Sequence, residues 1–401
     1  MSEQVPAQWS NFYLKDVSFV NLMMRRIYNV LIVANPYDAF MLEDDGRVEE
    51  KIYNEYMELG LRYPPTFTQV STIEEASKVL NTVDIDLVIC MPGNADNDAF
   101  DVARAVKAEF PDIHCVVLTP FSHGITKRIQ NEDLSIFDYV FCWLGNTNLI
   151  LSIIKLMEDK MNIDNDIHEV GVQMILLVED SIRFYSSILP NLYSYILTQS
   201  QNFATEALTR HEASLRQRGR PKVVLARTYE EAWDIYQRYK DNCLGVISDV
   251  RFPINNVEDK GSSATEGNIP VAEKDPEAGL KLLRAIRKED EYLPLIIESS
   301  ESENREKAEA EGFCFVDKNS KKMSVDLRRL LEEHMGFGDF IFRNPKTHEE
   351  VMRVRNLKEL QDNIFKIPRD SMLYHISRNH MSRWLSARAI FPVSSFLKGI
   401  T

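Results

Sequence analysis

The chain has 401 residues, of which 44% are hydrophobic and 27% are charged, and its formal net charge is -14. This balance is typical of a folded protein with enough apolar material for several cores, and it excludes wholesale disorder, collagen and small disulfide-stapled folds. The acidic charge argues against broad affinity for nucleic acid, because such affinity needs Lys and Arg to replace the counterions of phosphates.

The lengths of the apolar runs and the positions of the cysteines exclude further classes of protein. No apolar run approaches the ~18 residues of a membrane span, and the first nine residues lack the pattern of a signal peptide. The five cysteines lie far apart and mostly inside apolar runs, which excludes a disulfide framework or a zinc site and predicts small core residues. We therefore expect a cytoplasmic protein without a membrane partner.

A first α/β unit is predicted over residues 28–160, after an N-terminal extension over residues 1–27. Short β-branched runs alternate here with amphipathic helical stretches, which is the pattern of a parallel sheet with helices on both faces. A helix over about 148–160 closes the unit, and the polar residues 161–172 are predicted to be a linker. The five predicted strands are 29–33, 66–70, 87–91, 113–119 and 139–143.

A second unit over residues 173–335 repeats this order. NVLIVAN and MILLVED begin the two units, and DLVICMP and LGVISDV stand at their third strands, so we expect two related flavodoxin-like domains. Residues 253–275 are too polar and glycine-bearing to pack and are predicted to be a long loop. Residues 209–220 are predicted to be a second excursion. The five strands expected in this unit are 174–178, 222–225, 244–248, 294–298 and 313–316.

The tail, residues 336–401, changes character. It predicts a small β-hairpin with Asn344-Pro345 at its turn, a helix over 357–364, and then one amphipathic helix capped by Asp370 or Ser371. On one helix His375 and His380 would lie about 140° apart, so we expect packing in a core or interface and not a metal pair.

Carboxylates follow two strands of the second unit. Glu179 and Asp180 come directly after its first strand, and Asp249 comes after its third. These strands are neighbours in the flavodoxin-like order, so the three acids are expected to converge where ligands of such sheets bind. Like charges at ~4 Å cost about 4 kcal/mol per pair at an effective dielectric of ~20, and a Mg²⁺ ion would relieve that repulsion.

Further polar residues end the remaining strands at the same edge. Glu298, Ser299 and Ser300 end the fourth strand, and a hydroxyl there can donate to a phosphoryl oxygen. Lys318 follows the fifth strand and can supply a compensating positive charge. With Mg²⁺ present, one of the carboxylates can act as a nucleophile toward a small phosphodonor.

Residues 173–334 resemble the receiver domain of bacterial two-component response regulators. The resemblance rests on the pair Glu179-Asp180, Asp249 in ISDVRFP, Ser299, Lys318 in FVDKNS, and Gly279 at the start of the third helix. It implies that Asp249 is the phosphoacceptor, that Glu179, Asp180 and Asp249 bind Mg²⁺, and that Ser299 and Lys318 are the other catalytic residues. It also implies a histidine kinase or a histidine phosphotransfer protein as partner. The long loop after Asp249 departs from the family.

The first unit resembles the same fold with the chemistry removed. Ala34 and Asn35 stand where the acidic pair is expected, Met91 stands in place of the acceptor, and Cys142 is expected in place of the lysine, while Thr119 keeps the hydroxyl. Because methionine cannot form an acylphosphate, this unit is interpreted as a pseudo-receiver used for homodimerisation or for contact with another domain.

The tail resembles the linker before the ATP-grasp-like domain of bacterial proteins related to phosphoenolpyruvate synthase and pyruvate phosphate dikinase. That resemblance rests on KIPRDS and YHISRNHMSRWLSAR. It implies that this chain is the regulatory part of a longer protein, whose output domain would carry any dikinase activity.

The leading hypothesis is a phosphoryl-accepting signalling module, and two alternatives stay open. The first is a receiver-fold scaffold for dimerisation or protein interaction that is not phosphorylated, which the insertion beside Asp249 favours. The second is a hydrolase of the phosphoaspartate-forming superfamily, which is less well supported because Arg251 occupies the position of the second acid. DNA binding is disfavoured, since the arginines of the tail are interleaved with apolar residues.

Overall fold

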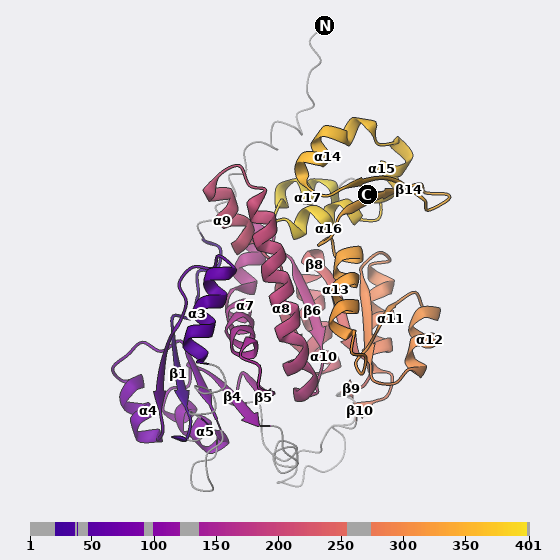
Figure 1. Cartoon of the computed structure of the whole chain (residues 1–401). Coiled ribbons are helices and arrows are strands. Elements are labelled where there is room, and N and C mark those ends of the chain that lie inside the picture. Colours follow the sequence, from indigo (N-terminus) through magenta and orange to yellow (C-terminus); the bar gives the residue numbers. More distant parts are fainter. Residues whose placement is uncertain are drawn as a thin grey trace.

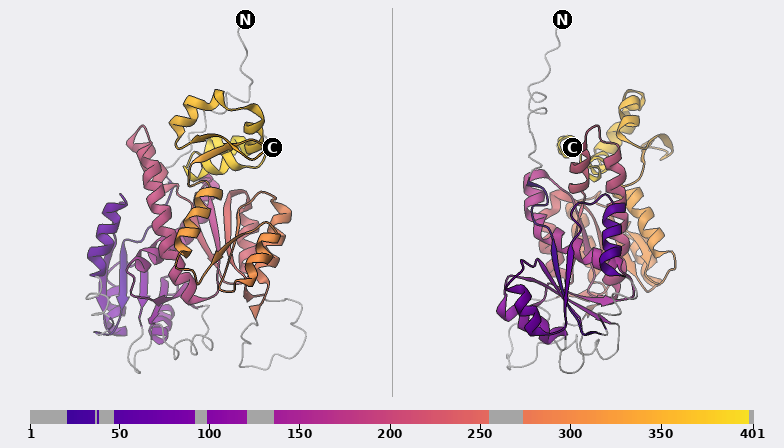
Figure 2. Two further views of the ribbon diagram at one scale, coloured as in Figure 1. Left: turned by 45° about the vertical axis from the view of Figure 1, so that its right-hand side comes forward. Right: turned by 60° about the vertical axis from the view of Figure 1, so that its left-hand side comes forward.

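The computed structural model describes residues 21–36, 38, 47–91, 99–120, 136–254 and 274–398. They form two five-stranded parallel sheets, each with flanking helices, and a small α+β tail (Figure 1). Figure 2 shows the two sheet units side by side, with the tail at one end of the second unit. Within the described ranges, no helix is both long enough and apolar enough to cross a bilayer. Residues 255–273 of the predicted long loop lie outside them.

The first sheet has the strand order β2-β1-β3-β4-β5, and every pair is parallel. The predicted strands are confirmed to within a residue or two, because strands covered on both faces read as continuous apolar runs. Its strands are β1 (Asn29–Val33), β2 (Thr66–Val70), β3 (Leu87–Cys90), β4 (His114–Pro120) and β5 (Tyr139–Trp143). Its described helices are α3 (Val48–Glu58), α4 (Ile73–Leu80), α5 (Ala99–Glu109) and α7 (Asn148–Val170).

The second sheet repeats this topology in the order β12-β11-β8-β6-β7. Two flavodoxin-like sheets are therefore confirmed, and the strand whose end carries Glu179 lies beside the strand that ends in Asp249. The strands are β6 (Met174–Val178), β7 (Lys222–Ala226), β8 (Cys243–Asp249), β11 (Leu295–Ser299) and β12 (Cys314–Asp317). The main helices are α8 (Ile182–Thr205), α10 (Tyr229–Tyr239), α11 (Ala278–Glu289), α12 (Glu303–Ala310) and α13 (Met323–His334).

Helix α7 does not end near Lys160, as the sequence predicted, but continues to Val170, so residues 161–170 are helical and not a loop. Its polar row of Glu158, Asn162 and Asp166 is buried, and this row hides the periodicity of a packed helix. The row faces the segment Asn21–Tyr28, which we call the strap and which has a turn at residues 22–23. The strap was predicted only as part of an N-terminal extension.

The strap binds α7 through its backbone. The amides of Met23, Arg25 and Ile27 donate to the side chains of Asp166, Asn162 and Glu158, at 3.0, 2.9 and 3.3 Å. Between Arg25 and Ile27, two residues of extended chain advance about 6.6 Å, which is close to the advance of about 6 Å over four helical residues, so these amides meet Asn162 and Glu158.

A further buried carboxylate of α7, that of Asp159, reaches the second unit. Asp159 Oδ1 accepts from Arg220 at 2.7 Å, and its Oδ2 accepts from Tyr193 Oη at 2.9 Å and from the Val223 amide at 3.0 Å. Around these bonds, one continuous apolar core includes residues of both sheets, such as Val30 and Ile175. The two units therefore pack as one body around α7 and α8.

The prediction of an irregular excursion over residues 209–220 is wrong, because this segment contains a helix, α9 (Arg210–Arg218). The side chain of Thr209 caps this helix by accepting from the Glu212 amide at 3.1 Å. Helix α9 packs on α8, and none of its residues is fully buried, which explains its polar sequence.

The tail confirms the predicted hairpin, as β13 (Phe340–Arg343) and β14 (Glu350–Val354), and the predicted short helix, as α14 (Leu357–Asn363). The predicted single helix after it is wrong. The chain forms α15 (Arg369–Ile376), α16 (His380–Ala387) and α17 (Phe391–Lys398), and α15 begins after Pro368 instead of at a cap by Asp370 or Ser371.

The break between α15 and α16 brings two histidines together. Asn379 takes a left-handed conformation with φ of 57° and turns the chain, so the Nδ1 atoms of His375 and His380 lie 3.0 Å apart. His375 Nε2 also accepts from the Arg343 amide at 2.9 Å. The expectation of core packing is correct, whereas the expected 140° separation fails because it assumed one helix.

We predict that the tail loses stability in mild acid. Burial, with smaller effects from neighbouring arginines, lowers the pKa of His375 to about 4 and that of His380 to about 3. An unfolded histidine titrates near ~6.5, so the stability due to neutral imidazoles is complete above that pH and is lost as the pH falls toward about 4. As the pH falls through this window, the hydrogen-exchange protection of residues 369–398 should decrease before that of β8. An equal loss of protection in both segments would contradict the role given to the two histidines.

The second prediction concerns the contact between the units. Asp159→Asn removes the negative charge that faces buried Arg220, so the free energy of unfolding should fall by about 3–5 kcal/mol. Asp362→Asn is the matched control, because its exposed pair with Lys358 is expected to contribute less than about 0.5 kcal/mol. Equal effects of the two variants in urea unfolding would show that the buried pair is unimportant.

Candidate metal centre

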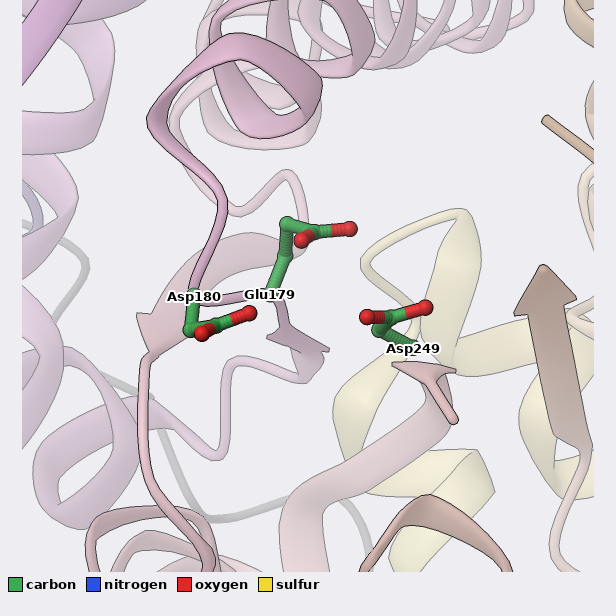
Figure 3. A group of neighbouring side chains, drawn as sticks. All are labelled: Glu179, Asp180 and Asp249. Atoms are coloured by element: carbon green, nitrogen blue, oxygen red, sulfur yellow. The ribbon is translucent and has the colours of Figure 1, made fainter. Parts of the chain in front are cut away.

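Three carboxylates meet at the carboxyl edge of the second sheet, as Figure 3 shows. Val178 is in register with Ser248, which sets Glu179 and Asp180 beside Asp249. Glu179, Asp180 and Asp249 each offer an oxygen, and these oxygens all lie within 4.8 Å of one another. Hard oxygen donors at this spacing fit Mg²⁺, which binds carboxylates and retains several waters.

Burial makes this cluster electrostatically costly. Glu179 is fully buried, and burial raises the pKa of its carboxyl well above the ordinary value, with a further upward effect from Asp249 that Lys318 opposes. Burial also raises the pKa of Asp180, where Lys274 acts in the opposite direction. A cation next to these carboxyls lowers their pKa and so favours the ionised form.

Lys318 supplies one such cation. Its Nζ pairs with Glu179 and lies 2.7 Å from Asp249 Oδ1, and it also lies 4.6 Å from the centroid of the Phe184 ring. Burial lowers the pKa of this ammonium, but the surrounding carboxylates outweigh burial and raise the pKa above its ordinary value. The predicted position of the lysine at this edge agrees with its position in the structure.

Lys274 supplies a second cation that sequence reasoning missed. It lies on β10 (Lys274–Asp275), which pairs antiparallel with β9 (Phe252–Pro253), and its Nζ is 2.6 Å from Asp180 Oδ2. The only signal in the sequence was a lysine at the end of the predicted loop. The antiparallel pairing of β10 with β9, which follows Asp249, brings this lysine to the cluster.

Glu298 is a fourth acid whose role was also missed. It is in register with Asp249, and both its carboxyl oxygens are buried without a hydrogen-bond donor among the described residues. Burial raises the pKa of Glu298 to about 7, and the positive charge of Lys318 acts in the opposite direction. It was noted in the sequence only as a strand end.

The two candidate hydroxyls differ in position. Ser299 is buried, and its Oγ accepts from the Glu301 amide at 3.1 Å and from Asn304 Nδ2 at 3.0 Å. Ser300 lies one residue further on and is exposed. Ser299 is thus hydrogen-bonded to the start of α12, and a change in these bonds would alter the position of that helix.

Gly279 fixes the backbone behind Asp249. A Cβ atom at this position would lie 1.9 Å from the Asp249 carbonyl oxygen, and the Gly279 amide donates to Val250 O at 3.0 Å. Only glycine permits this approach of α11, so the predicted glycine at the start of this helix is confirmed with its physical reason.

The equivalent edge of the first sheet has no carboxylate cluster among the described residues. By strand register, Ala34 of the first sheet is equivalent to Glu179 of the second, and Met91 is equivalent to Asp249, as predicted. The lysine position needs a correction: Thr119 pairs with Cys142 as Ser299 pairs with Asp317, so Trp143 and not Cys142 is equivalent to Lys318.

Comparisons with known proteins add two structural likenesses. No family model matches the sequence, and no curated protein matches it. The chain is similar to the signal receiver domain of a putative LuxO repressor protein from Vibrio parahaemolyticus, with 15% identity, 35% of this chain and 96% of that chain covered, and a TM-score of 0.26. It is also similar to a probable two-component system response regulator/GGDEF domain protein, with 11% identity, 76% and 99% coverage, and a TM-score of 0.30.

We predict that Lys274 competes with a divalent cation. Lys274→Gln removes the ammonium that pairs with Asp180, so Mg²⁺ should bind about 3- to 10-fold more tightly in a calorimetric titration. Lys281→Gln is the control, because Lys281 pairs with Asp275 and not with the cluster. Equal affinities for Mg²⁺ in both variants and in the wild type would refute the competition.

Proposed function

We propose that the second unit is a receiver module that accepts a phosphoryl group on Asp249 in the presence of Mg²⁺. One observation carries this proposal: Glu179, Asp180, Asp249 and Lys318 converge at the carboxyl edge of a sheet with flavodoxin-like order. A cation site next to a nucleophilic carboxylate and a lysine is the arrangement that phosphoryl transfer to an acid requires.

Asp249 is the best placed nucleophile of the cluster. Its side chain is 15% exposed, whereas that of Glu179 is fully buried, so a phosphodonor can reach Asp249. A carboxylate oxygen attacks phosphorus, the P–N bond of a phosphohistidine breaks, and the leaving imidazole takes up a proton. When bound by Glu179, Asp180 and Asp249, Mg²⁺ would shield the carboxylates from the incoming phosphoryl oxygens.

Lys318 and Ser299 would read the modification. Lys318 already lies 2.7 Å from the acceptor carboxylate, so its ammonium can pair with a phosphoryl oxygen after a small movement. Ser299 would have to give up its bonds to Glu301 and Asn304 to donate to the phosphate. Phosphorylation would thereby shift α12 and the β11–β12 face between two packings.

The first unit acts in this proposal as a pseudo-receiver that contacts other domains. Its β5 edge is already covered by α8, since the Cys142 amide donates to Ser186 Oγ at 2.9 Å and Tyr185 Oη donates to Val140 O. These bonds support a role of the first unit in contact with the second, and homodimerisation remains a prediction.

In this proposal the tail carries the output. It packs at the edge opposite the carboxylates, where Arg383 donates to Tyr292 O at 2.6 Å and Lys398 donates to Asp241 O at 2.7 Å. A histidine kinase or phosphotransfer protein is the expected donor. An attached domain related to phosphoenolpyruvate synthase stays a prediction from the resemblance of the tail.

A scaffold that is not phosphorylated is the second candidate function. The ion pair between Lys274 and Asp180 and the one between Lys318 and Glu179 favour it, because two ammonium groups already offset part of the negative charge of the acids without a metal. In that case the receiver fold would serve only as a surface for protein interaction.

Acetyl phosphate distinguishes these candidates. Incubation with Mg²⁺ should add one phosphoryl group to the wild type, as seen by intact mass, and Asp249→Asn should abolish the gain because the nucleophile is lost. Asp234→Asn, at an exposed position of α10, is the control and should behave as the wild type does. Absence of any gain with several donors, in a protein that binds Mg²⁺, would support the scaffold.

A further inference from the structure

A second polar site lies where the two units and the strap meet, on α9 and α7 and away from the carboxylate cluster. It is a pocket of about 40 Å³. The strap contributes Arg26, the segment after α3 contributes Arg62, and one face of α9 contributes Ser214, Gln217 and Arg218. Those three residues of α9 are spaced i, i+3 and i+4, so they share one helical face.

The charges of this pocket are unbalanced. Its lining contains five cations and one carboxylate, Glu158. Lys155 pairs with Glu158 at 2.7 Å, and Arg220 pairs with Asp159 at 2.7 Å. Arg26, Arg62 and Arg218 remain, and within the described ranges none of these three forms an ion pair with an acid.

The three arginines also act on one another. The pKa of the Arg218 guanidinium is lowered, first by burial and then by the positive charges of Arg26 and Arg62. Such repulsion is unexpected in a chain with a formal charge of -14, which offers many acids for pairing. An anion between the three side chains would remove this cost, since Arg binds phosphate through paired N–H donors.

Two tyrosines, Tyr63 and Tyr28, lie near Arg26 of the pocket lining. The Arg26 guanidinium is 5.7 Å from the centroid of the Tyr63 ring, and this ring contacts Tyr28 in an edge arrangement with centroids 6.1 Å apart. Both tyrosines are more than two-fifths exposed, at 58% for Tyr63 and 45% for Tyr28. An aromatic surface of this kind beside arginines can stack a planar ring that carries a phosphate.

We propose that Arg26, Arg62 and Arg218 form a binding site for the phosphate group of a small molecule. Ser214 and Gln217 supply neutral donors to the same anion, and Tyr63 contacts any ring that the phosphate carries. Because the arginines come from the strap, from the first unit and from α9 of the second unit, the ligand stabilises the arrangement of all three segments. This site is independent of phosphorylation at Asp249.

The test is a calorimetric titration of the full chain in EDTA without Mg²⁺, which keeps the carboxylate cluster from contributing. Inorganic phosphate, AMP and adenosine are the three probes. Saturable binding of phosphate alone identifies a free anion as the ligand, and tighter binding of AMP identifies a phosphorylated ring compound. Binding of adenosine as tight as that of AMP, or no binding of any probe, would overturn the proposal.

Two variants locate the binding. Arg62→Gln and Arg218→Gln should each weaken phosphate or AMP by at least about tenfold, because each removes a charged donor. Arg218→Lys should retain part of the affinity. Arg355→Gln, at an exposed position in the tail, is the matched control and should bind as the wild type does. Unchanged affinity in both pocket variants would place the anion elsewhere and refute the site.

Discussion

The arrangement of the two units depends on the carboxylate of Asp159, which is fully buried at their junction. It belongs to the helix that closes the first unit, yet its donors Arg220, Tyr193 and the Val223 amide all belong to the second. A buried charge is tolerated only with such complete pairing. The orientation of α7 is therefore fixed, and with it the shared apolar core and the cover that α8 provides for β5.

The candidate metal centre and the tail lie at opposite edges of the second sheet. Glu179 and Asp249 stand at its carboxyl edge, whereas Arg383 and Lys398 hold the tail at the amino edge. A signal between them has to pass through the body of the unit. The bonds from Ser299 to Glu301 and Asn304 connect the site edge to α12, and under the proposed phosphorylation they are the element that would change.

Much of the fold and of the site follows from the sequence, because buried parallel strands read as apolar runs and their ends define the site edge. The polar row of α7 could not be recognised, since its burial depends on the strap amides and on Arg220. No local sequence signal predicted the turn at Asn379, which brings His375 and His380 into contact. Lys274 reaches Asp180 only through the pairing of β10 with β9.

The hydrogen bonds between the strap and α7 also limit which substitutions and insertions the protein sequence can accept. Because the strap contributes backbone groups to these bonds, the exposed side chain of Arg25 can be exchanged without loss of them, whereas Met23 and Ile27 are buried. One residue inserted between Glu158 and Asp166 would instead turn the rest of the helix by about 100° and misplace Asn162 and Asp166 together. Among related sequences, the stretch from Glu158 to Asp166 should therefore keep both its length and its polar side chains.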